Sequence, residues 1–361
     1  MKSFQFMKES NNVYKTTYKD YSNHSVIMVS TDRQILVEKS VVRQRMLEYS
    51  KQYKELHIIV FSDSKIEDKE IAQNCKVYST KSFVRWNYVS DARKIGVKII
   101  DEINPEIPIL ITCQDPFETA LVGKCLNSKR KNSELLVQIH TDLYSPYFID
   151  ARIGILNSIL NRIRLFISRF TLNHANIIRV VSNKIADSLV KRGFNPEDII
   201  VKPIDINIDY IKNDKTSFVL KEKFPQFKNI ILMISRIEAE KNFSMAIDAM
   251  KIVLAKKPDT GLVIVGSGTM QDYLKRRSEI LKISKNIVFE GWQTDLTPYY
   301  RGCDVFLVCS WYEGYGLTFK EAEANNCKII STDVGIAKDV GATIVNWTSE
   351  DIATKILDNI K

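Results

Sequence analysis

The sequence has no long apolar run and no Cys-x-x-Cys pair, and it has only four histidines. The first two absences narrow the classes of protein to which the chain can belong. Without about 18 consecutive apolar residues, no segment is expected to span a membrane. Without a Cys-x-x-Cys pair, the six cysteines predict buried free thiols in a reducing compartment rather than a disulfide framework or a metal site. We therefore expect no bound metal and a cytoplasmic protein.

The composition that remains is that of a globular protein large enough for two domains. The chain has 361 residues, of which 45% are hydrophobic and 26% are charged. Its net charge of +9 suits anionic partners, and nucleotides, anionic lipids and nucleic acid all qualify. Residues 1–22 are polar and lack the apolar stretch of a signal peptide, so we expect a partly ordered N-terminal tail.

Short continuous apolar runs alternate with segments of helical period along most of the chain. In the first half the expected strands are Ser25–Ser30, His57–Phe61, Lys76–Tyr78, Pro108–Cys113, Leu135–His140 and Asn176–Val181. The expected helices there are Glu38–Tyr53, Val84–Ile103, Pro116–Asn132 and Asn183–Arg192. This alternation predicts βαβ units around a parallel sheet that is covered on both faces.

The second half repeats the pattern. Its expected strands are Asn229–Ile234, Gly261–Val265, Asn286–Phe289, Val305–Cys309 and Lys328–Ser331, and its expected helices are Asn242–Ala255, Thr269–Ile283, Thr294–Arg301 and Leu317–Asn326. We predict an α/β protein with two Rossmann-like domains, residues 23–203 and 229–361, joined by a charged, weakly periodic hinge at 204–228. Doubly wound sheets bind ligands at the carboxyl ends of their strands, so a shared cleft between the domains is expected.

The segment from Ser310 to Glu321 is the most informative for chemistry. It follows a buried strand and opens a helix, and its glycines Gly314 and Gly316 allow a tight turn with close approach to a ligand. The helix start offers unpaired N–H groups to an anion. Acidic residues at such a place suit contacts to hydroxyl groups, with the amides of residues 315–318 holding the charge.

Seven residues separate Glu313 from Glu321. If the segment is fully helical, the two lie about 12 Å apart along the axis. Paired carboxylates of glycosidases lie ~5–9.5 Å apart, so the spacing argues against such a pair and suits two contacts on one long ligand. The alternative is purely structural: one helix-capping glutamate and one solvated glutamate.

Glu313-x7-Glu321 with its Gly-Tyr-Gly resembles the signature of the group 1 (family 4) retaining glycosyltransferases of GT-B architecture. Four further segments are similar to strand ends of that family: Ile234–Asn242, Val263–Gly268, Val288–Trp292 and His174–Ser182. The resemblance covers roughly residues 135–350 and is strongest in the second half. It implies a GT-B fold, with the first domain binding the acceptor and the second the nucleotide-sugar donor.

The resemblance also implies a role for each matching residue. Glu321 would hold the ribose hydroxyls, and Arg236 and Lys241 would neutralise the diphosphate as it leaves. Glu313 would hold the donor sugar together with the amides that follow Gly314. The remaining donor-binding residues would be Gly266, Trp292, Tyr315, Gly316, Leu317 and Thr318. Each basic residue has a plainer alternative as a surface charge near a helix start.

At the end of a strand in the first domain, His140-Thr-Asp142 is the matching acceptor-side segment. By resemblance His140 touches the donor sugar, often through its carbonyl, and Asp142 assists the acceptor hydroxyl. Polar residues are common at strand ends, so both have a structural alternative. No Asp-x-Asp motif is present to ligate a divalent ion on the diphosphate, which favours a metal-independent enzyme in which Arg236 and Lys241 replace the ion.

We therefore predict retaining transfer of a hexose-type sugar to a sugar or polyprenyl-linked acceptor in cell-envelope polysaccharide synthesis. No cofactor beyond the donor and no nucleic acid is expected. The alternatives are a nucleotide-sugar epimerase, a sugar phosphorylase, or a nucleotide-sugar-binding protein without turnover. A dinucleotide enzyme is more distant, because Gly266-Ser-Gly268 lacks the third glycine of that fingerprint.

Residues 151–170 contain no acidic side chain and show a helical apolar stripe. The stripe consists of Ile153, Leu156, Leu160, Ile163, Ile167 and Phe170, and Arg152, Arg162 and Arg169 lie largely off it. A basic amphipathic helix of this kind can rest on an anionic membrane, here at its inner face. A core-facing helix whose stripe packs on its own sheet has the same pattern.

Overall fold

The computed structural model describes residues 14–17, 19–63, 68–150, 155–204 and 218–360, without the side chains of residues 149–158. The chain forms two compact units. Unit 1 consists of residues 1–140 and 159–203, and unit 2 of residues 141–158 and 204–361. Residues 141–158 thus group with the second unit, whereas a linear division at residue 203 assigns them to the first. Much of the expected hinge, and residues 1–13 of the expected tail, lie outside the described residues.

Unit 1 is built on an eight-stranded sheet in the order β3-β4-β2-β1-β5-β6-β7-β8. The strands are β1 (Ser25–Ser30), β2 (Glu55–Val60), β3 (Lys69–Ala72), β4 (Cys75–Ser79), β5 (Ile109–Cys113), β6 (Ser133–Ile139), β7 (Ile177–Val180) and β8 (Ile199–Val201). All neighbouring strands pair in parallel except β3, which runs antiparallel to β4 at one edge. The central strands β1 and β5 are buried except for the partly exposed Met28, as expected of strands that are covered on both faces.

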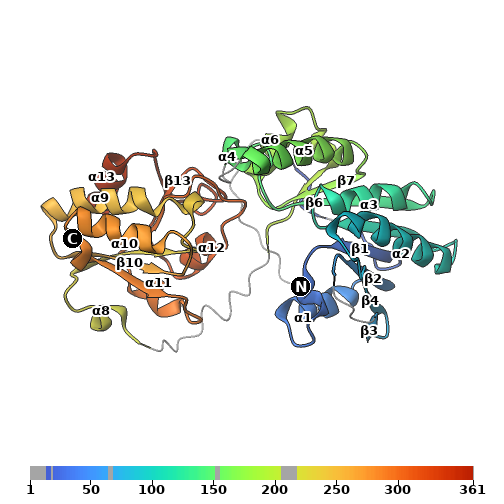
Figure 1. The fold of residues 1–361 in the computed structure, drawn as a ribbon, viewed down its shortest axis with the longest axis horizontal. Helices are drawn as coiled ribbons and strands as arrows, with labels where there is room; N and C mark the ends of the chain where they lie inside the picture. The colour runs from blue at the N-terminus through green and yellow to red at the C-terminus, as the bar shows by residue number, and fades with distance from the viewer. Residues whose placement is uncertain (1–13, 18, 64–67, 151–154, 205–217, 361) are drawn as a thin grey trace. The chain divides into compact units, whose positions relative to one another are not determined.

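The helices of unit 1 connect successive strands across the sheet. They are α1 (Val41–Ser50), α2 (Tyr88–Glu102), α3 (Glu118–Asn127), α5 (Ile155–Leu172) and α6 (Asn183–Val190), with short turns η1 (Arg33–Leu36), η2 (Arg85–Asn87) and η3 (Pro196–Asp198). The first residues of α5 are grouped with unit 2. Helices α2 and α3 pack together, and α5 lies beside the start of α3, where Thr171 donates to the Pro116 carbonyl (Figure 1).

Unit 2 contains a six-stranded, wholly parallel sheet in the order β11-β10-β9-β12-β13-β14. The strands are β9 (Asn229–Ile234), β10 (Thr260–Val265), β11 (Ile287–Gly291), β12 (Val305–Val308), β13 (Ile329–Thr332) and β14 (Thr343–Val345). The helices are α4 (Pro146–Asp150), α8 (Leu220–Lys223), α9 (Phe243–Lys256), α10 (Gln271–Ile280), α11 (Thr297–Gly302), α12 (Leu317–Ala324) and α13 (Ser349–Asn359), with turns η4 (Ala239–Lys241) and η5 (Ser284–Asn286). A core of Ile, Val, Leu and Met side chains joins α9, α13 and the sheet.

The predicted α/β class and the two parallel-sheet domains are confirmed, with one correction. Strand β3 (Lys69–Ala72) is antiparallel and is not among the expected strands, because its Lys-Glu-Ile-Ala sequence carries too little apolar character to stand out. Several expected helices extend beyond the observed ones at both ends, as in α1, which begins at Val41 because Ser40 caps it. Others share an end with the observed helix, as α6 and α12 do at Asn183 and Leu317.

Candidate functional site

Four consecutive loops of unit 2 carry the residues singled out from the sequence. Because β9, β10, β11 and β12 are parallel, the loops that follow them emerge at one edge of the sheet. They carry Arg236 and Lys241 after β9, Gly266 after β10, Trp292 after β11, and Glu313, Gly314, Tyr315 and Gly316 after β12. Leu317, Thr318 and Glu321 follow on α12. The fold therefore gathers the whole predicted donor set at one edge.

Lys241 and Glu313 form the tightest contact of this edge. The Lys241 Nζ lies 2.6 Å from Glu313 Oε1, and the two side chains are only 13% and 15% exposed. The Ser310 hydroxyl donates to the same carboxylate oxygen at 2.8 Å. Glu313 is thus held in place by one cation and one hydroxyl from two neighbouring loops. The Lys241 ammonium has further N–H groups that can donate hydrogen bonds to a diphosphate oxygen.

Arg236, by contrast, is open to solvent. Its side chain is 69% exposed, and its only ion pair among the described residues is a 3.3 Å contact to Glu240, four residues on. An exposed pair of this kind contributes little stability. The guanidinium therefore loses little when it turns to an incoming anion, and its fork geometry matches phosphate oxygens.

Gly266 and Gly268 shape the loop that carries Arg236. Gly266 has φ +137°, a conformation that side chains rarely adopt, and a Cβ there would collide with the Ser235 carbonyl. A Cβ on Gly268 would collide with the backbone of Ile237. The Ile237 amide donates to Ser267 O at 2.9 Å. The two glycines thus let one loop backbone lie directly on the next, which is a structural task besides the predicted donor contact.

The start of α12 has the form expected of an anion-binding helix end. Gly316 is the N-cap residue with φ +83°, and it offers no side chain to cap the first amides. Tyr315 is buried, and its carbonyl accepts from the Ile336 amide at 3.1 Å, so its ring and carbonyl face inward. The tyrosine side chain therefore holds the turn, while the helix start presents N–H groups of Leu317 and Thr318.

Glu321 lies within this helix and is positioned by Tyr300. The Tyr300 hydroxyl donates to Glu321 Oε2 at 2.7 Å, and the Tyr300 ring is buried. Burial, and then the adjacent Glu321 carboxylate, raise the pKa of Tyr300 well above its ordinary value, so the phenol keeps its proton and remains a donor. The carboxylate retains further lone pairs for hydroxyl groups.

The Tyr300 contact gives a testable expectation. Tyr300→Phe should raise KM for the donor several-fold and leave kcat nearly unchanged, because the variant frees Glu321 to turn without removing it. Glu321→Ala should weaken donor binding more strongly. Steady-state kinetics and nucleoside-diphosphate titration measure both. Equal donor affinity in the wild type and in Glu321→Ala would remove Glu321 from the site.

The distance estimated between Glu313 and Glu321 rested on a continuous helix, and that premise is wrong. Helix α12 begins only at Leu317, so Glu313 lies in the loop before it. Gly316 in the left-handed region breaks any helical path between the two. The two glutamates still have different surroundings, Lys241 for one and Tyr300 for the other, and this difference supports separate roles.

Two further features of unit 2 bear on the site: the exposure of Trp292 and the arrangement of side chains that could bind a metal ion. Trp292 is 71% exposed, so its own unit does not bury the indole. Among the described residues, no group of three or more His, Cys, Asp or Glu side chains is placed to hold a metal ion.

His140 is the last residue of unit 1 before the segment that joins unit 2. Burial, followed by the positive charges of Arg179 and Arg45, lowers the pKa of His140 to about 4. The imidazole is therefore neutral at pH 7 and suits a hydroxyl partner rather than an anion. Its carbonyl comes directly after β6, at the carboxyl edge of the sheet.

Asp142 has a structural task in addition to the one implied by resemblance. Its Oδ1 accepts from the Tyr144 amide at 3.2 Å, and its carbonyl accepts from the Ser145 amide at 3.2 Å. These bonds form the turn that leads into α4, so the acceptor-side role remains a proposal.

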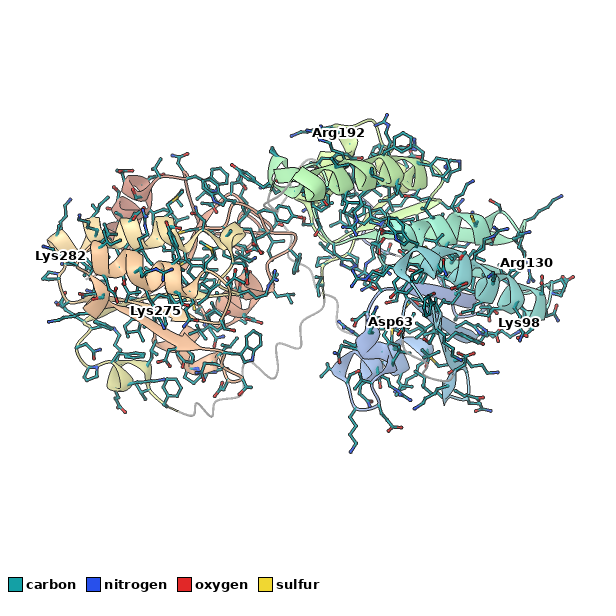
Figure 2. The ribbon with its side chains drawn as sticks, viewed as in Figure 1. Asp63, Lys98, Arg130, Arg192, Lys275 and Lys282 are labelled. Atoms are coloured by element: carbon teal, nitrogen blue, oxygen red, sulfur yellow. The ribbon has the colours of Figure 1, made fainter. Side chains whose placement is uncertain are left out.

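Arg33, which follows β1 in the same unit, is also engaged. Its Nη1 lies 3.0 Å from the carboxylate of Asp63, a residue labelled in Figure 2, and its Nη2 donates to the Tyr88 hydroxyl at 2.7 Å. This guanidinium is therefore partly neutralised at the carboxyl edge of the unit 1 sheet.

Sequence reasoning missed the residues that hold the site together. Tyr300 and Ser310 position the two glutamates, and Trp311 stacks between Tyr147 and Trp347 with centroid distances of 5.5 and 6.2 Å. The Tyr147 contact joins α4 to the loop that follows β12 within unit 2. Only Ser310 had a sequence signal, its place at the end of a buried strand.

Comparison with known proteins agrees with this geometry. Residues 214–347 match the family described as "Glycosyl transferases group 1". The lipopolysaccharide core biosynthesis mannosyltransferase LpsB of Rhizobium meliloti is 28% identical over 145 residues, which cover 39% of this chain and 41% of that protein. An Escherichia coli UDP-Gal:α-D-GlcNAc-diphosphoundecaprenol α-1,3-galactosyltransferase is 26% identical over 146 residues, covering 39% of this chain and 38% of that one. The chain thus matches less than half the length of these relatives.

The likeness in structure extends much further than the likeness in sequence. The HepE protein of Anabaena, solved in complex with UDP and glucose, superposes with a TM-score of 0.65 over 92% of this chain and 89% of its own, at 16% identity. Such low identity speaks for the fold alone, and the fold is the two-domain GT-B architecture. The motif-bearing loops at one edge of unit 2 lie within the residues that match the group 1 glycosyltransferases, residues 214–347, and the chain has the GT-B fold.

Proposed function

We propose that the chain transfers a hexose-type sugar from a nucleoside-diphosphate donor to a sugar or lipid-linked acceptor, with retention of anomeric configuration. The observation that carries this proposal is the placement of Lys241, Glu313 and Glu321. Glu313 is fixed by Lys241, Glu321 is fixed by Tyr300, and both follow β12 at the ligand-binding edge of the unit 2 sheet. This provides separate carboxylates for a sugar and a ribose, with cations nearby for the diphosphate between them.

In this proposal each group acts on a defined part of the donor. Glu321 holds the ribose hydroxyls, and Glu313 with the amides after Gly314 holds the sugar hydroxyls. Arg236 and Lys241 stabilise the negative charge that develops on the departing diphosphate. His140 contacts the donor sugar through its neutral ring or carbonyl, and Asp142 assists the acceptor hydroxyl.

The acceptor class rests on the relatives. One relative is named for the lipopolysaccharide core and another for a diphosphoundecaprenol-linked sugar. These names support a glycan or lipid-linked acceptor and the synthesis of a cell-envelope polysaccharide. A place at the cytoplasmic face of the membrane is part of the proposal because the six cysteines, without a Cys-x-x-Cys pair, suit a reducing compartment. Contact of residues 151–170 with that membrane is a separate proposal, because the transfer of a sugar does not require it.

A donor screen tests the proposed function. The full chain is incubated with UDP-, GDP- and ADP-sugars, and release of nucleoside diphosphate is measured with and without a lipid-linked or oligosaccharide acceptor. We expect release that depends on the acceptor, and NMR of the product should show the anomeric configuration of the donor. Donor consumption without acceptor would indicate an epimerase, dependence on inorganic phosphate a phosphorylase, and binding without release a protein that does not turn over.

Metal independence is tested in the same assay. Because Arg236 and Lys241 would supply the positive charge, the rate of transfer should change by no more than about two-fold in EDTA. A concentration of about 5–10 mM is of the order needed to remove weakly bound Mg²⁺. A loss restored by Mg²⁺ or Mn²⁺ would show that the two side chains do not replace an ion.

A further inference from the structure

Helix α5 (Ile155–Leu172) is attached to unit 1 by a polar face. Asn161, Ser168 and Thr171 are buried, and the Thr171 hydroxyl donates to the Pro116 carbonyl at 2.6 Å. The Ser168 hydroxyl donates to Leu165 O within the helix at 2.8 Å. In a helix that covers a sheet, apolar residues normally occupy this inward face. Here three of the four buried side chains that are described, Asn161, Ser168 and Thr171, are polar and have partners, and Leu172 is the fourth. Leu165 and Ile167 are half-buried.

The outward face of α5 is apolar. Its exposed large side chains are Ile159, Leu160, Ile163, Phe166 and Phe170, which are 41–78% exposed. At 100° per residue, Ile159, Ile163, Phe166 and Phe170 fall within a sector of about 60°. We call these four residues the α5 apolar face. Phe166 is its most exposed member.

This arrangement corrects one of the two expectations for the segment. The expectation that the stripe faces the core is wrong for Leu160, Ile163 and Phe170, which are exposed. Ile167 is half-buried. Ile153 and Arg152 lie outside the described residues, and the side chain of Leu156 is not described. The apolar stripe that the sequence predicts therefore points away from the sheet over most of its described length.

The charged side chains of α5 beside this face are all positive. Arg162 and Arg169 are exposed on one border of the α5 apolar face, and neither forms an ion pair with a described carboxylate. Residues 151–170 include no acidic side chain. Arg164, on the other border, lies 3.6 Å from Glu118 and over the Phe117 ring. Two arginines thus remain available to an anionic surface.

We propose that the α5 apolar face docks on an anionic lipid surface, with its apolar side chains at the level of the acyl chains and Arg162 and Arg169 at the phosphates. A second copy of the chain suits the face less well, because a symmetric contact would bring the same arginines together. No helix of the described residues combines the length and apolarity needed to cross a bilayer, and a helix lying in the interface needs neither.

This inference rests on the proposed function only for its purpose, which is to bring the site to a lipid-linked acceptor. Binding to lipid itself requires no sugar transfer. The two can therefore fail separately, and the experiment measures lipid binding alone.

Vesicle co-sedimentation tests the inference. The full chain is mixed with vesicles of phosphatidylcholine containing 30% phosphatidylglycerol, or of phosphatidylcholine alone, at 50 and 500 mM NaCl. We expect the chain to pellet with the anionic vesicles, and the pelleted fraction to fall at high salt. Phe166→Asp should lower the partition coefficient more than ten-fold, and the pair Arg162→Gln with Arg169→Gln about five-fold for each charge.

The matched control is Ile280→Asp. Ile280 ends α10 in unit 2 and is 79% exposed, against 78% for Phe166, so it introduces the same charge at an equally exposed apolar position. Pelleting of this variant should equal that of the wild type. Thermal unfolding of each variant, and its donor binding, confirm that the fold is intact.

Three results would overturn the inference. The first is no pelleting with anionic vesicles at low salt. The second is pelleting that Phe166→Asp leaves unchanged, which would assign the contact to another surface. The third is a dimer that Phe166→Asp converts to a monomer while vesicle binding persists, which would show that a second copy covers the face.

Discussion

Arg236→Ala is expected to lower kcat about 10²–10³-fold while leaving the free energy of unfolding within about 0.5 kcal/mol of the wild type. The first expectation follows from the proposed contact to the departing diphosphate, which is made most strongly when charge develops there. The second follows from the structure, since Arg236 is 69% exposed and its pair with Glu240 is a surface contact. Initial rates at saturating donor and denaturant unfolding measure the two quantities.

Two variants sharpen this test. Arg236→Lys keeps the charge but loses the bidentate fork, so its rate should fall between those of the wild type and the alanine variant. Arg276→Ala removes an exposed arginine from α10, away from the motif-bearing loops, and should change neither rate nor stability. An Arg236→Ala enzyme with an unchanged kcat would remove this arginine from the chemistry.

Lys241→Met should differ from Arg236→Ala in its effect on stability, with a large loss of both stability and activity. Removing the lysine leaves Glu313 uncompensated in a mostly buried place, and breaking such a pair costs about 3 kcal/mol or more. The unfolding of unit 2 can be followed by tryptophan fluorescence, because Trp292, Trp311 and Trp347 all lie there, against Trp86 alone in unit 1.

A double-mutant cycle separates the pair from its members. Lys241→Met with Glu313→Gln should be more stable than the sum of the single losses predicts, by about 0.5–3 kcal/mol. The exposed pair of Lys320 and Glu323, at 2.8 Å, is the matched control, and its cycle should give a coupling near zero. Strict additivity at Lys241 and Glu313 would contradict the close contact between them.

The strands that form the centres of both sheets were readable from the sequence because they are continuously apolar. Ser25–Ser30 and Asn229–Ile234 were predicted with the bounds that β1 and β9 have. The strands β3, β8 and β14 were missed, and each lies at or next to a sheet edge with four residues or fewer. Such short segments show too few residues for a recognisable period, even where they are buried as in β8, so their pairing depends on neighbours that the local sequence does not reveal.

The candidate site was predictable in its charged residues but not in their partners. The order of residues along the loops indicated that Lys241 and Glu313 lie at one edge, because both follow parallel strands. Their direct contact joins residues 72 positions apart and had no sequence signal. The same holds for α5, where the period of the apolar residues predicts a stripe but not which way it faces.

The two glycines of the β10 loop have a consequence for how sequences of this family are interpreted. A Cβ at Gly266 or Gly268 would strike the backbone at Ser235 or Ile237, on either side of Arg236. Substitutions there displace the arginine without touching any ligand. In a library of random variants, both positions would be depleted as severely as a residue that binds the substrate. Intolerance to change at these glycines therefore records, at least at Gly268, how two backbones are stacked, and a map of active-site residues drawn from variation alone would include Gly268 for that reason.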